Sequence, residues 1–364
     1  MKKTNLFFLI SGIFLFNLSV NSLVAQTKAI KVSALKSNDY GVQYSLPKTQ
    51  LEINVEYNQI TQKAGPYARY AARYLGMNDS DIILEDQIYY TLENVSVTEK
   101  GIPNKDQSYL VLFKSKTTAP FVYLTEEGVI CAINTEYIPE TTIKEKANPN
   151  PQSELPNINP QSIYTEEYLR AGSISKMAEV AAKNIYKIRE SRQDILTGEV
   201  DNMPKDGAAL KIILNNLEVQ EKIWTELFIG NSQVVKQSKQ ISIAPETEMS
   251  NEILFRFSKY LGVVDVNDLS GIPIYVNLKN LKTVEIPATD PKKKAKEPES
   301  IVYNVPGKAE IEIYNGLKKI YSATVNVTQF GTTQILANSL FEDRRAPIQV
   351  QFYPTTGGIK SINN

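Results

Sequence analysis

The side chains best suited to molecular recognition are concentrated between Lys63 and Gly76, in the segment KAGPYARYAARYLG. Tyrosine and arginine often anchor protein interfaces, because they combine a large contact area with hydrogen-bonding groups. The segment supplies five candidate binding residues of these types, namely Tyr67, Arg69, Tyr70, Arg73 and Tyr74. Their chemistry is that of noncovalent binding.

The same segment also has the pattern of a short helix. Proline directly after Gly65 favours a helix start, and Gly76 favours its end. At helical periodicity one face is small and apolar. That face consists of Ala68, Ala71, Ala72 and Leu75. We favour a helix that packs against a sheet, with its tyrosine hydroxyls near water and its arginines solvated, over a ligand site.

A second cluster of charged side chains occupies the segment KIRESRQDILTGEVDNMPKDG. Its members are Arg189, Glu190, Arg192, Glu199, Asp201 and Asp206. Their spacing does not match a calcium-binding loop, and Asp206 is positioned to cap the helix that follows. We interpret the cluster as structural ion pairs and expect no metal site.

The absence of histidine from all 364 residues restricts the possible chemistry. It excludes histidine-assisted serine or cysteine hydrolases, histidine-bearing zinc sites and imidazole proton shuttles. The single cysteine, Cys131, cannot form an intramolecular disulfide, and its alternating context GVICAINTE predicts a buried, inert thiol in a strand. Carboxylate pairs, lysine-activated serine and tyrosine remain as catalytic groups.

The N-terminus has the layout of a secretory signal: Lys2 and Lys3, an apolar run from Leu6 to Phe16, and a small residue at Ala25. We therefore expect residues 1–25 to be removed and the mature chain to be exported, to the periplasm or the cell surface. Loss of the two lysines leaves 38 basic against 40 acidic side chains, which does not favour a nucleic-acid partner. No later run is long and apolar enough to span a membrane.

Hydrophobic periodicity and composition divide the remaining chain into four parts. Alternating apolar residues predict a β-rich unit with a short inserted helix over 27–137, and prolines indicate an exposed linker over 138–162. Two segments with helical periodicity predict a hairpin of antiparallel helices over 163–230. A second β-rich unit is expected over 231–364, interrupted by a surface loop, PATDPKKKAKEPES.

Glycines mark three expected ends or turns. Gly128 and Asn315-Gly316 each lie between two apolar runs and predict β-hairpins. Gly198 is expected to end the first of the two long helices.

The apolar series of the two expected helices align in one antiparallel register. In this register, Ile195 faces Leu210, Ile188 faces Leu217, and the small Ala181 faces the large Trp224. The two β-rich units also share motifs. YSLPKTQLEINV is similar to YNVPGKAEIEIY, and LTEEGVICAI is similar to YPTTGGIKSI, in the same order. These matches indicate an internal duplication.

Several of these segments together resemble an uncharacterised family of exported proteins from Gram-negative gut anaerobes, classed as a domain of unknown function. They are YSLPKTQLEINVE, KAGPYARYAARYLG, the stretch from YLRAGSISK to LFIG, and FYPTTGGIKSI. The resemblance covers nearly the whole mature chain and is most specific in the helical stretch. It implies export and supplies no catalytic residue and no cofactor.

The sequence thus predicts an α+β protein in which two β-rich units flank an antiparallel helical hairpin. We expect a binding or structural role in the cell envelope, with an envelope protein or a glycan as partner, without intrinsic catalysis and without a cofactor. The alternative is a glycan or peptidoglycan hydrolase, which needs two facing carboxylates in an aromatic cleft.

Overall fold

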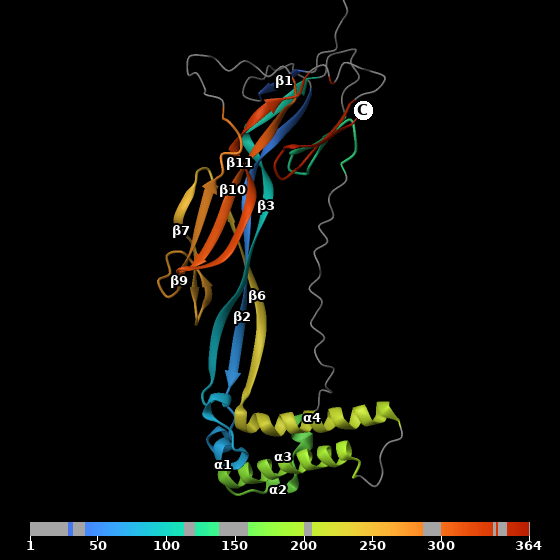
Figure 1. The fold of residues 1–364 in the computed structure, drawn as a ribbon, viewed down its shortest axis with the longest axis vertical. Coiled ribbons are helices and arrows are strands. Elements are labelled where there is room, and N and C mark those ends of the chain that lie inside the picture. Colours follow the sequence, from blue (N-terminus) through green and yellow to red (C-terminus); the bar gives the residue numbers. More distant parts are fainter. Residues whose placement is uncertain are drawn as a thin grey trace, which may run out of the picture.

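The computed structural model describes residues 28–31, 41–112, 121–137, 159–199, 206–286, 300–337, 340 and 348–363. The expected signal peptide, most of the expected linker and residues 287–299 of the expected surface loop lie outside these ranges. The molecule is elongated, with helices at one end and most of the β structure at the other (Figure 1). It has the mixed α+β composition that the sequence predicts.

A long antiparallel ribbon forms the axis of the molecule. Strands β2 (Gly41–Lys63) and β3 (Gln87–Leu112) pair along most of their length, β6 (Asn231–Ile243) pairs with β2, and β1 (Lys28–Lys31) pairs with β3. Leu51, Ile53 and Val55 alternate with more exposed residues and are buried, which confirms the predicted strand pattern. Below this apolar stretch, β2, β3 and β6 continue to the helices.

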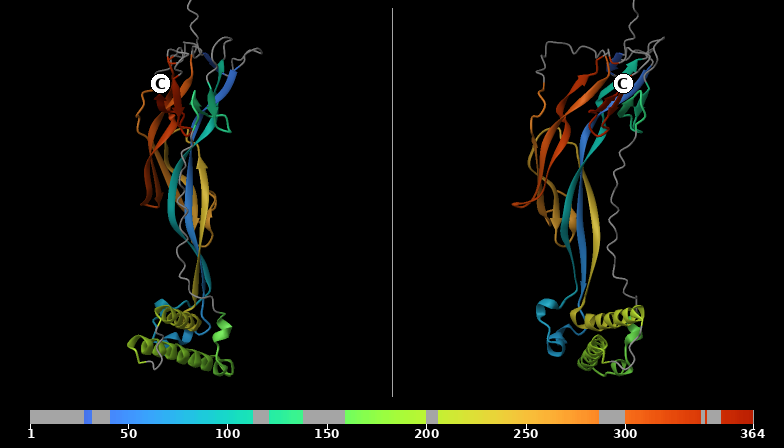
Figure 2. Two further views of the ribbon diagram at one scale, coloured as in Figure 1. Left: turned by 90° about the vertical axis from the view of Figure 1, so that its right-hand side faces the viewer. Right: turned by 45° about the vertical axis from the view of Figure 1, so that its right-hand side comes forward.

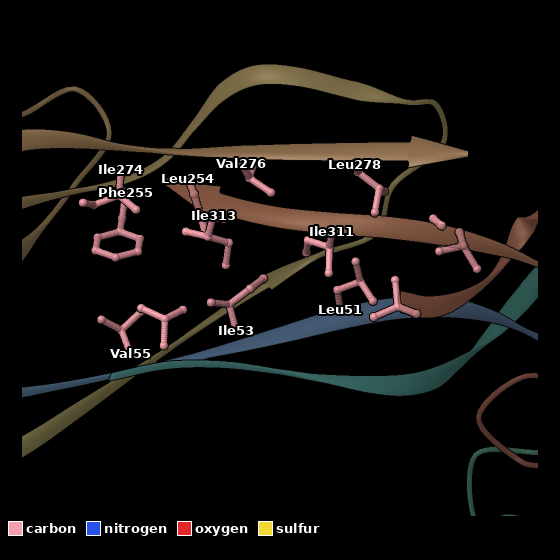
Figure 3. Packing of buried hydrophobic residues seen from close by; sticks show 14 of the residues in the cluster. Leu51, Ile53, Val55, Leu254, Phe255, Ile274, Val276, Leu278, Ile311 and Ile313 are labelled. Carbon is pink, nitrogen blue, oxygen red and sulfur yellow. The ribbon is translucent and has the colours of Figure 1, made fainter. Parts of the chain in front are cut away.

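A second sheet packs on the apolar face of the ribbon. Its strand order is β11 (Lys318–Ile335), β10 (Val302–Asn315), β9 (Ile272–Asn280), β7 (Met249–Ser258) and β8 (Gly262–Val264). Ile53 and Val55 lie toward Ile311 and Ile313 in the layer between the two sheets (Figure 3). The predicted hairpin at Asn315-Gly316 is confirmed, because β10 and β11 pair on either side of it.

A third, smaller sheet has the order β13 (Ile359–Asn363), β12 (Gln349–Phe352), β5 (Ile130–Ile133) and β4 (Val122–Leu124). The predicted hairpin at Gly128 joins β4 to β5, and Cys131 is buried in β5. Burial raises the pKa of this thiol to about 11, which disfavours the reactive thiolate.

The two expected β-rich units are interlocked in the structure. Strand β6, placed by the sequence at the start of the second unit, instead joins the sheet of the first. Strand β12 of the second unit pairs with β5 of the first. These pairings join segments that are far apart in the chain, and therefore local hydrophobic periodicity cannot predict them.

The helical module comprises η2 (Ala68–Tyr70), α1 (Ala71–Leu75), η3 (Asp79–Asp81), η4 (Pro160–Ile163), α2 (Glu166–Leu169), α3 (Ile174–Thr197) and α4 (Gly207–Ile229). One part of the expected linker is helical, because Pro160 begins η4 at a position where its missing N–H costs little. The expected caps are present: Asp206 accepts a hydrogen bond from Ala208 N, and Gly198 ends α3 with a left-handed backbone. No helix among the described residues is long and apolar enough to cross a membrane.

Helices α3 and α4 lie side by side, and two ion pairs join them (Figure 1). Arg189 Nε lies 2.6 Å from Glu221 Oε1, and Arg192 Nη1 lies 2.8 Å from Glu221 Oε2. Of the expected partners, Ile188 is buried and Leu217 is partly buried, and both belong to one apolar cluster. Ala181 and Trp224 belong to one buried cluster.

Candidate functional site

The structure places Tyr67 inside the helical module. Its ring is buried 5.6 Å from that of Phe228, and its hydroxyl lies 2.6 Å from the hydroxyl of Tyr168. The expectation that this hydroxyl lies near water is therefore wrong. Helical periodicity alone could not reveal the burial, because the covering residues come from α2 and α4. Tyr67 anchors the segment and does not offer a contact surface.

The backbone around Tyr67 is held closely against α4. Tyr67 N donates a hydrogen bond of 2.8 Å to Leu227 O. A Cβ at Gly65 would lie 2.5 Å from the same carbonyl oxygen, so only glycine permits this approach. The expected single helix is a 3₁₀ turn followed by the short α1, and Gly76 ends it with φ of 64°. Ala71 is buried as expected, whereas Ala72 is exposed.

The other four candidate residues lie at the surface. Tyr70 and Tyr74 stack with ring centroids 6.1 Å apart, and the Arg73 guanidinium lies 5.5 Å from the centroid of the Tyr74 ring. Arg69 and Arg73 are exposed, as expected, while Tyr70 and Tyr74 are partly buried. The segment thus presents two stacked rings and two guanidinium groups to solvent.

Helix α3 extends this group of side chains. Tyr186 is 50% exposed, and its hydroxyl donates a hydrogen bond of 2.9 Å to Tyr74 O. The Arg189 guanidinium lies 5.9 Å from the centroid of the Tyr186 ring. We define the Tyr–Arg surface as Arg69, Tyr70, Arg73, Tyr74, Tyr186 and Arg189. Tyr186 was not among the predicted candidate residues, although its place away from the apolar stripe of α3 marks it as exposed.

The expected ion-pair cluster lies beside the Tyr–Arg surface. Arg189 and Arg192 both pair with Glu221, and the three side chains line a hollow of about 480 Å³ with Thr225. Glu221 comes from α4 and was not among the predicted members of the cluster. Asp201 lies outside the described residues. Within the described ranges, no group of three or more Cys, Asp or Glu side chains is arranged to hold a metal ion.

The alternative catalytic function requires two carboxylates in an aromatic cleft. A hollow of about 520 Å³ on the ribbon is lined by Glu56, Glu93 and Tyr57, among others. Glu56 accepts a hydrogen bond of 3.4 Å from Asn94 Nδ2, and Glu93 accepts one of 3.0 Å from Thr91 Oγ1. Both carboxylates are exposed. A general acid is instead usually held in a desolvated site.

The buried tyrosines predict a loss of stability at high pH. Burial raises the pKa of Tyr67, Tyr168 and Tyr44 above the usual value of about 10. Their contribution to stability is present in full below pH about 10 and is lost as the pH rises further, because only the unfolded chain ionises readily. We expect the free energy of unfolding by urea to fall between pH 9 and pH 11.

The matched variants for this prediction are Tyr168→Phe and Tyr260→Phe. Tyr168→Phe should make the fall between pH 9 and pH 11 smaller. Tyr260→Phe, at a residue that is 70% exposed, should leave it unchanged. Equal falls in wild type and Tyr168→Phe would contradict the assigned burial.

The comparisons with known proteins identify one family. The family described as Domain of unknown function (DUF4831) matches residues 40–360 of the chain. No curated protein and no solved structure matches the chain. The matched range contains β2, β3 and β6 of the ribbon, the second sheet, the helical module and most of the small sheet, whereas β1 and the last residues of β13 lie outside it.

Proposed function

Since the chain belongs to the DUF4831 family, whose description assigns no activity, we propose a function from the geometry of its helical module. The protein is an exported component of the cell envelope that binds an acidic partner protein through the Tyr–Arg surface. The observation that carries this proposal is a series of contacts between neighbouring side chains. Tyr70 stacks on Tyr74, and Tyr186 is hydrogen-bonded to Tyr74 O. The Arg73 guanidinium lies over the Tyr74 ring, and that of Arg189 lies over the Tyr186 ring.

The surface has the properties of a preorganised interface. Aromatic and arginine side chains contribute most of the binding energy in many protein complexes, and rings that are already stacked lose little conformational freedom on binding. Three arginines surround the rings, and one of them is already paired with Glu221. The remaining positive charge of Arg69 and Arg73 favours a partner that presents carboxylates.

The ribbon gives this surface a defined position. Two backbone hydrogen bonds join the end of α4 to segments next to the ribbon. Tyr67 N donates to Leu227 O, and Ile83 N donates to Ile229 O at 2.9 Å. The helical module lies beyond the end of the ribbon, away from the packed sheets, in every view (Figures 1 and 2). A partner bound there would be held at a distance from the β structure.

We also propose that the two β-rich units arose by duplication and that α3 and α4 form an antiparallel hairpin. Ser45 N donates to Gly128 O at 2.9 Å, and Asn304 N donates to Gly357 O at 3.1 Å. Ser45 and Asn304 occupy equivalent positions in the two similar motifs. Each precedes a proline at which the strand register shifts. These shared contacts support a common origin.

The proposed function predicts the effect of removing the guanidinium groups of Arg69 and Arg73. Arg69→Ala combined with Arg73→Ala should abolish capture of the partner from envelope extracts, because both charges would contact it. The melting temperature should change little, since both side chains are exposed. Capture is measured by affinity purification of the mature chain, followed by identification of proteins that bind in salt-sensitive fashion.

The control removes two charges elsewhere on the helical module. Arg170→Ala with Lys211→Ala changes one exposed residue directly after α2 and one in α4, and this variant should retain the same partner. Equal capture by both double variants would contradict the proposed surface. Turnover of a glycan or peptidoglycan by purified protein, abolished by Glu56→Gln or Glu93→Gln, would instead support the hydrolase.

A further inference from the structure

A separate hollow of about 450 Å³ is lined by residues of β10, β11, β13 and the turn that connects β12 to β13. These strands lie away from the helical module (Figure 1). The size of the hollow is within the range of small-ligand sites. Its polar and aromatic lining residues are Tyr303, Asn304, Asn326, Tyr353, Thr355 and Thr356. The hollow shares no residue with the Tyr–Arg surface.

The turn that forms one wall is fixed by its own hydrogen bonds. Gly357 N donates to Tyr353 O at 2.6 Å, and Tyr353 N donates to Gly358 O at 2.9 Å. Thr356 Oγ1 accepts a hydrogen bond of 3.3 Å from Gly358 N. Gly357 has φ of 69° and leaves no room for a Cβ, which would lie 2.7 Å from Pro47 Cδ. The wall is therefore preformed.

Asn304 contributes a side-chain amide whose orientation is determined by its neighbours. The residue is buried, and its Nδ2 donates to Pro47 O at 2.8 Å and to Thr356 O at 2.9 Å. Both amide hydrogens are thus used. The side-chain carbonyl, Oδ1, receives no hydrogen bond from any residue that the structure describes. A ligand hydroxyl that donates to this oxygen would make a hydrogen bond that no described residue provides.

Asn326 presents a second amide of the same kind. Its Nδ2 lies 3.3 Å from Glu99 Oε1 and 3.2 Å from Glu99 Oε2, and its backbone N donates to Glu99 Oε1 at 2.7 Å. Its Oδ1 also has no donor among the described residues. Because the Glu99 carboxylate accepts hydrogen bonds from the Asn326 Nδ2 group, Oδ1 of Asn326 can accept a hydrogen bond from a ligand.

Tyr353 adds an aromatic face beside the two amides. Its side chain is 42% exposed, and the Lys360 ammonium lies 5.7 Å from the ring centroid. The described residues that line the hollow include no Asp, Glu, Lys or Arg. Free acceptors, an aromatic ring and an uncharged lining match a neutral ligand that carries many hydroxyl donors and an apolar C–H face.

We propose that this hollow binds a sugar residue of a neutral glycan. The sugar ring stacks on Tyr353, and its hydroxyls donate to Oδ1 of Asn304 and of Asn326. At the equivalent position of the first β-rich unit, Ser45 Oγ is already hydrogen-bonded to Ser108 Oγ at 2.8 Å. The free amide acceptor is thus specific to the second unit. The site does not depend on the Tyr–Arg surface, and the protein would hold a glycan at one end and a protein at the other.

The test is binding of the mature chain to an array of neutral tetrasaccharides built from glucose, mannose, galactose or N-acetylglucosamine, with uronic-acid tetrasaccharides as the acidic arm. We expect at least one neutral tetrasaccharide to bind and none of the uronic-acid tetrasaccharides to bind. Tyr353→Ala should then weaken the affinity for that neutral tetrasaccharide at least about tenfold, because the ring no longer covers the sugar. Tyr353→Phe, which keeps the ring, should retain affinity within about twofold.

The matched control is Tyr260→Ala. Tyr260 is 70% exposed and also has a lysine ammonium, that of Lys259, 5.9 Å from its ring centroid, but it does not line the hollow. This variant, and the double variant of Arg69 and Arg73, should bind the same tetrasaccharide as wild type. The proposal is overturned if no neutral tetrasaccharide binds, if acidic ones bind instead, or if Tyr260→Ala weakens binding as much as Tyr353→Ala.

Discussion

Trp224→Ala is expected to destabilise the helical module by about 3 to 5 kcal/mol, the cost of truncating a large aromatic side chain in a core. Trp224 is 2% exposed, and its ring lies 5.3 Å from that of Tyr164 and 5.0 Å from that of Tyr168. Its loss would leave a cavity lined by both tyrosines and by α3. Chemical unfolding followed by circular dichroism at 222 nm would report the helical transition.

The matched control is Ile212→Ala, on the same helix. Ile212 is exposed, so its truncation removes little buried area and should change the unfolding free energy by less than about 0.5 kcal/mol. A small effect of Trp224→Ala, similar to that of the control, would contradict the burial of Trp224 and the packing of α2 on the two long helices.

Gly230→Ala is expected to cost at least about 3 kcal/mol, because backbone strain and steric overlap act together. Gly230 joins α4 to β6 with φ of 79° and ψ of −172°, a region of backbone space that is nearly exclusive to glycine. An added Cβ would overlap Lys63 O and lie 3.0 Å from Ile83 Cβ. The substitution would separate the helical module from the ribbon.

Two other glycines separate these contributions. Gly76 has φ of 64° and open space where a Cβ would lie. Gly76→Ala should therefore lower the free energy of unfolding only by the strain of alanine in a left-handed conformation, about 1 to 2 kcal/mol. Gly172 has open space and no positive φ, so Gly172→Ala should be close to neutral. Thermal unfolding of the three variants should give this order. A Gly230→Ala variant as stable as Gly76→Ala would contradict the close packing at the junction.

Local features of the fold were predictable from the sequence because they depend on neighbouring residues. The alternation of Leu51, Ile53 and Val55 follows from the two-residue period of a strand with one buried face. Gly128 and Gly316 both adopt positive φ in the turns that the sequence analysis assigned to them. The Asp206 cap likewise needs only the residues that follow it.

Features that depend on distant segments were not predictable in this way. The sequence of β6 has no signal that selects β2 as its partner instead of the strands that follow. Burial of Tyr67 depends on Tyr168 and Phe228, which are remote in the chain. The orientation of the Asn304 amide, on which the proposed glycan site depends, is set by Pro47 O and Thr356 O, which accept its two hydrogen bonds.

The central proposal is that a partner is held at the Tyr–Arg surface in the cell envelope, and site-specific photo-crosslinking in intact cells tests it most directly. A photoreactive phenylalanine analogue at Ala72, an exposed position next to Arg73 in the chain, should give one discrete adduct in the envelope fraction. The same probe at Leu317, which is fully exposed in the β10–β11 turn, should give none. The adduct from position 72 should disappear when Arg69 and Arg73 are changed to alanine. No adduct at position 72, or an adduct that persists without the two arginines, would contradict the account.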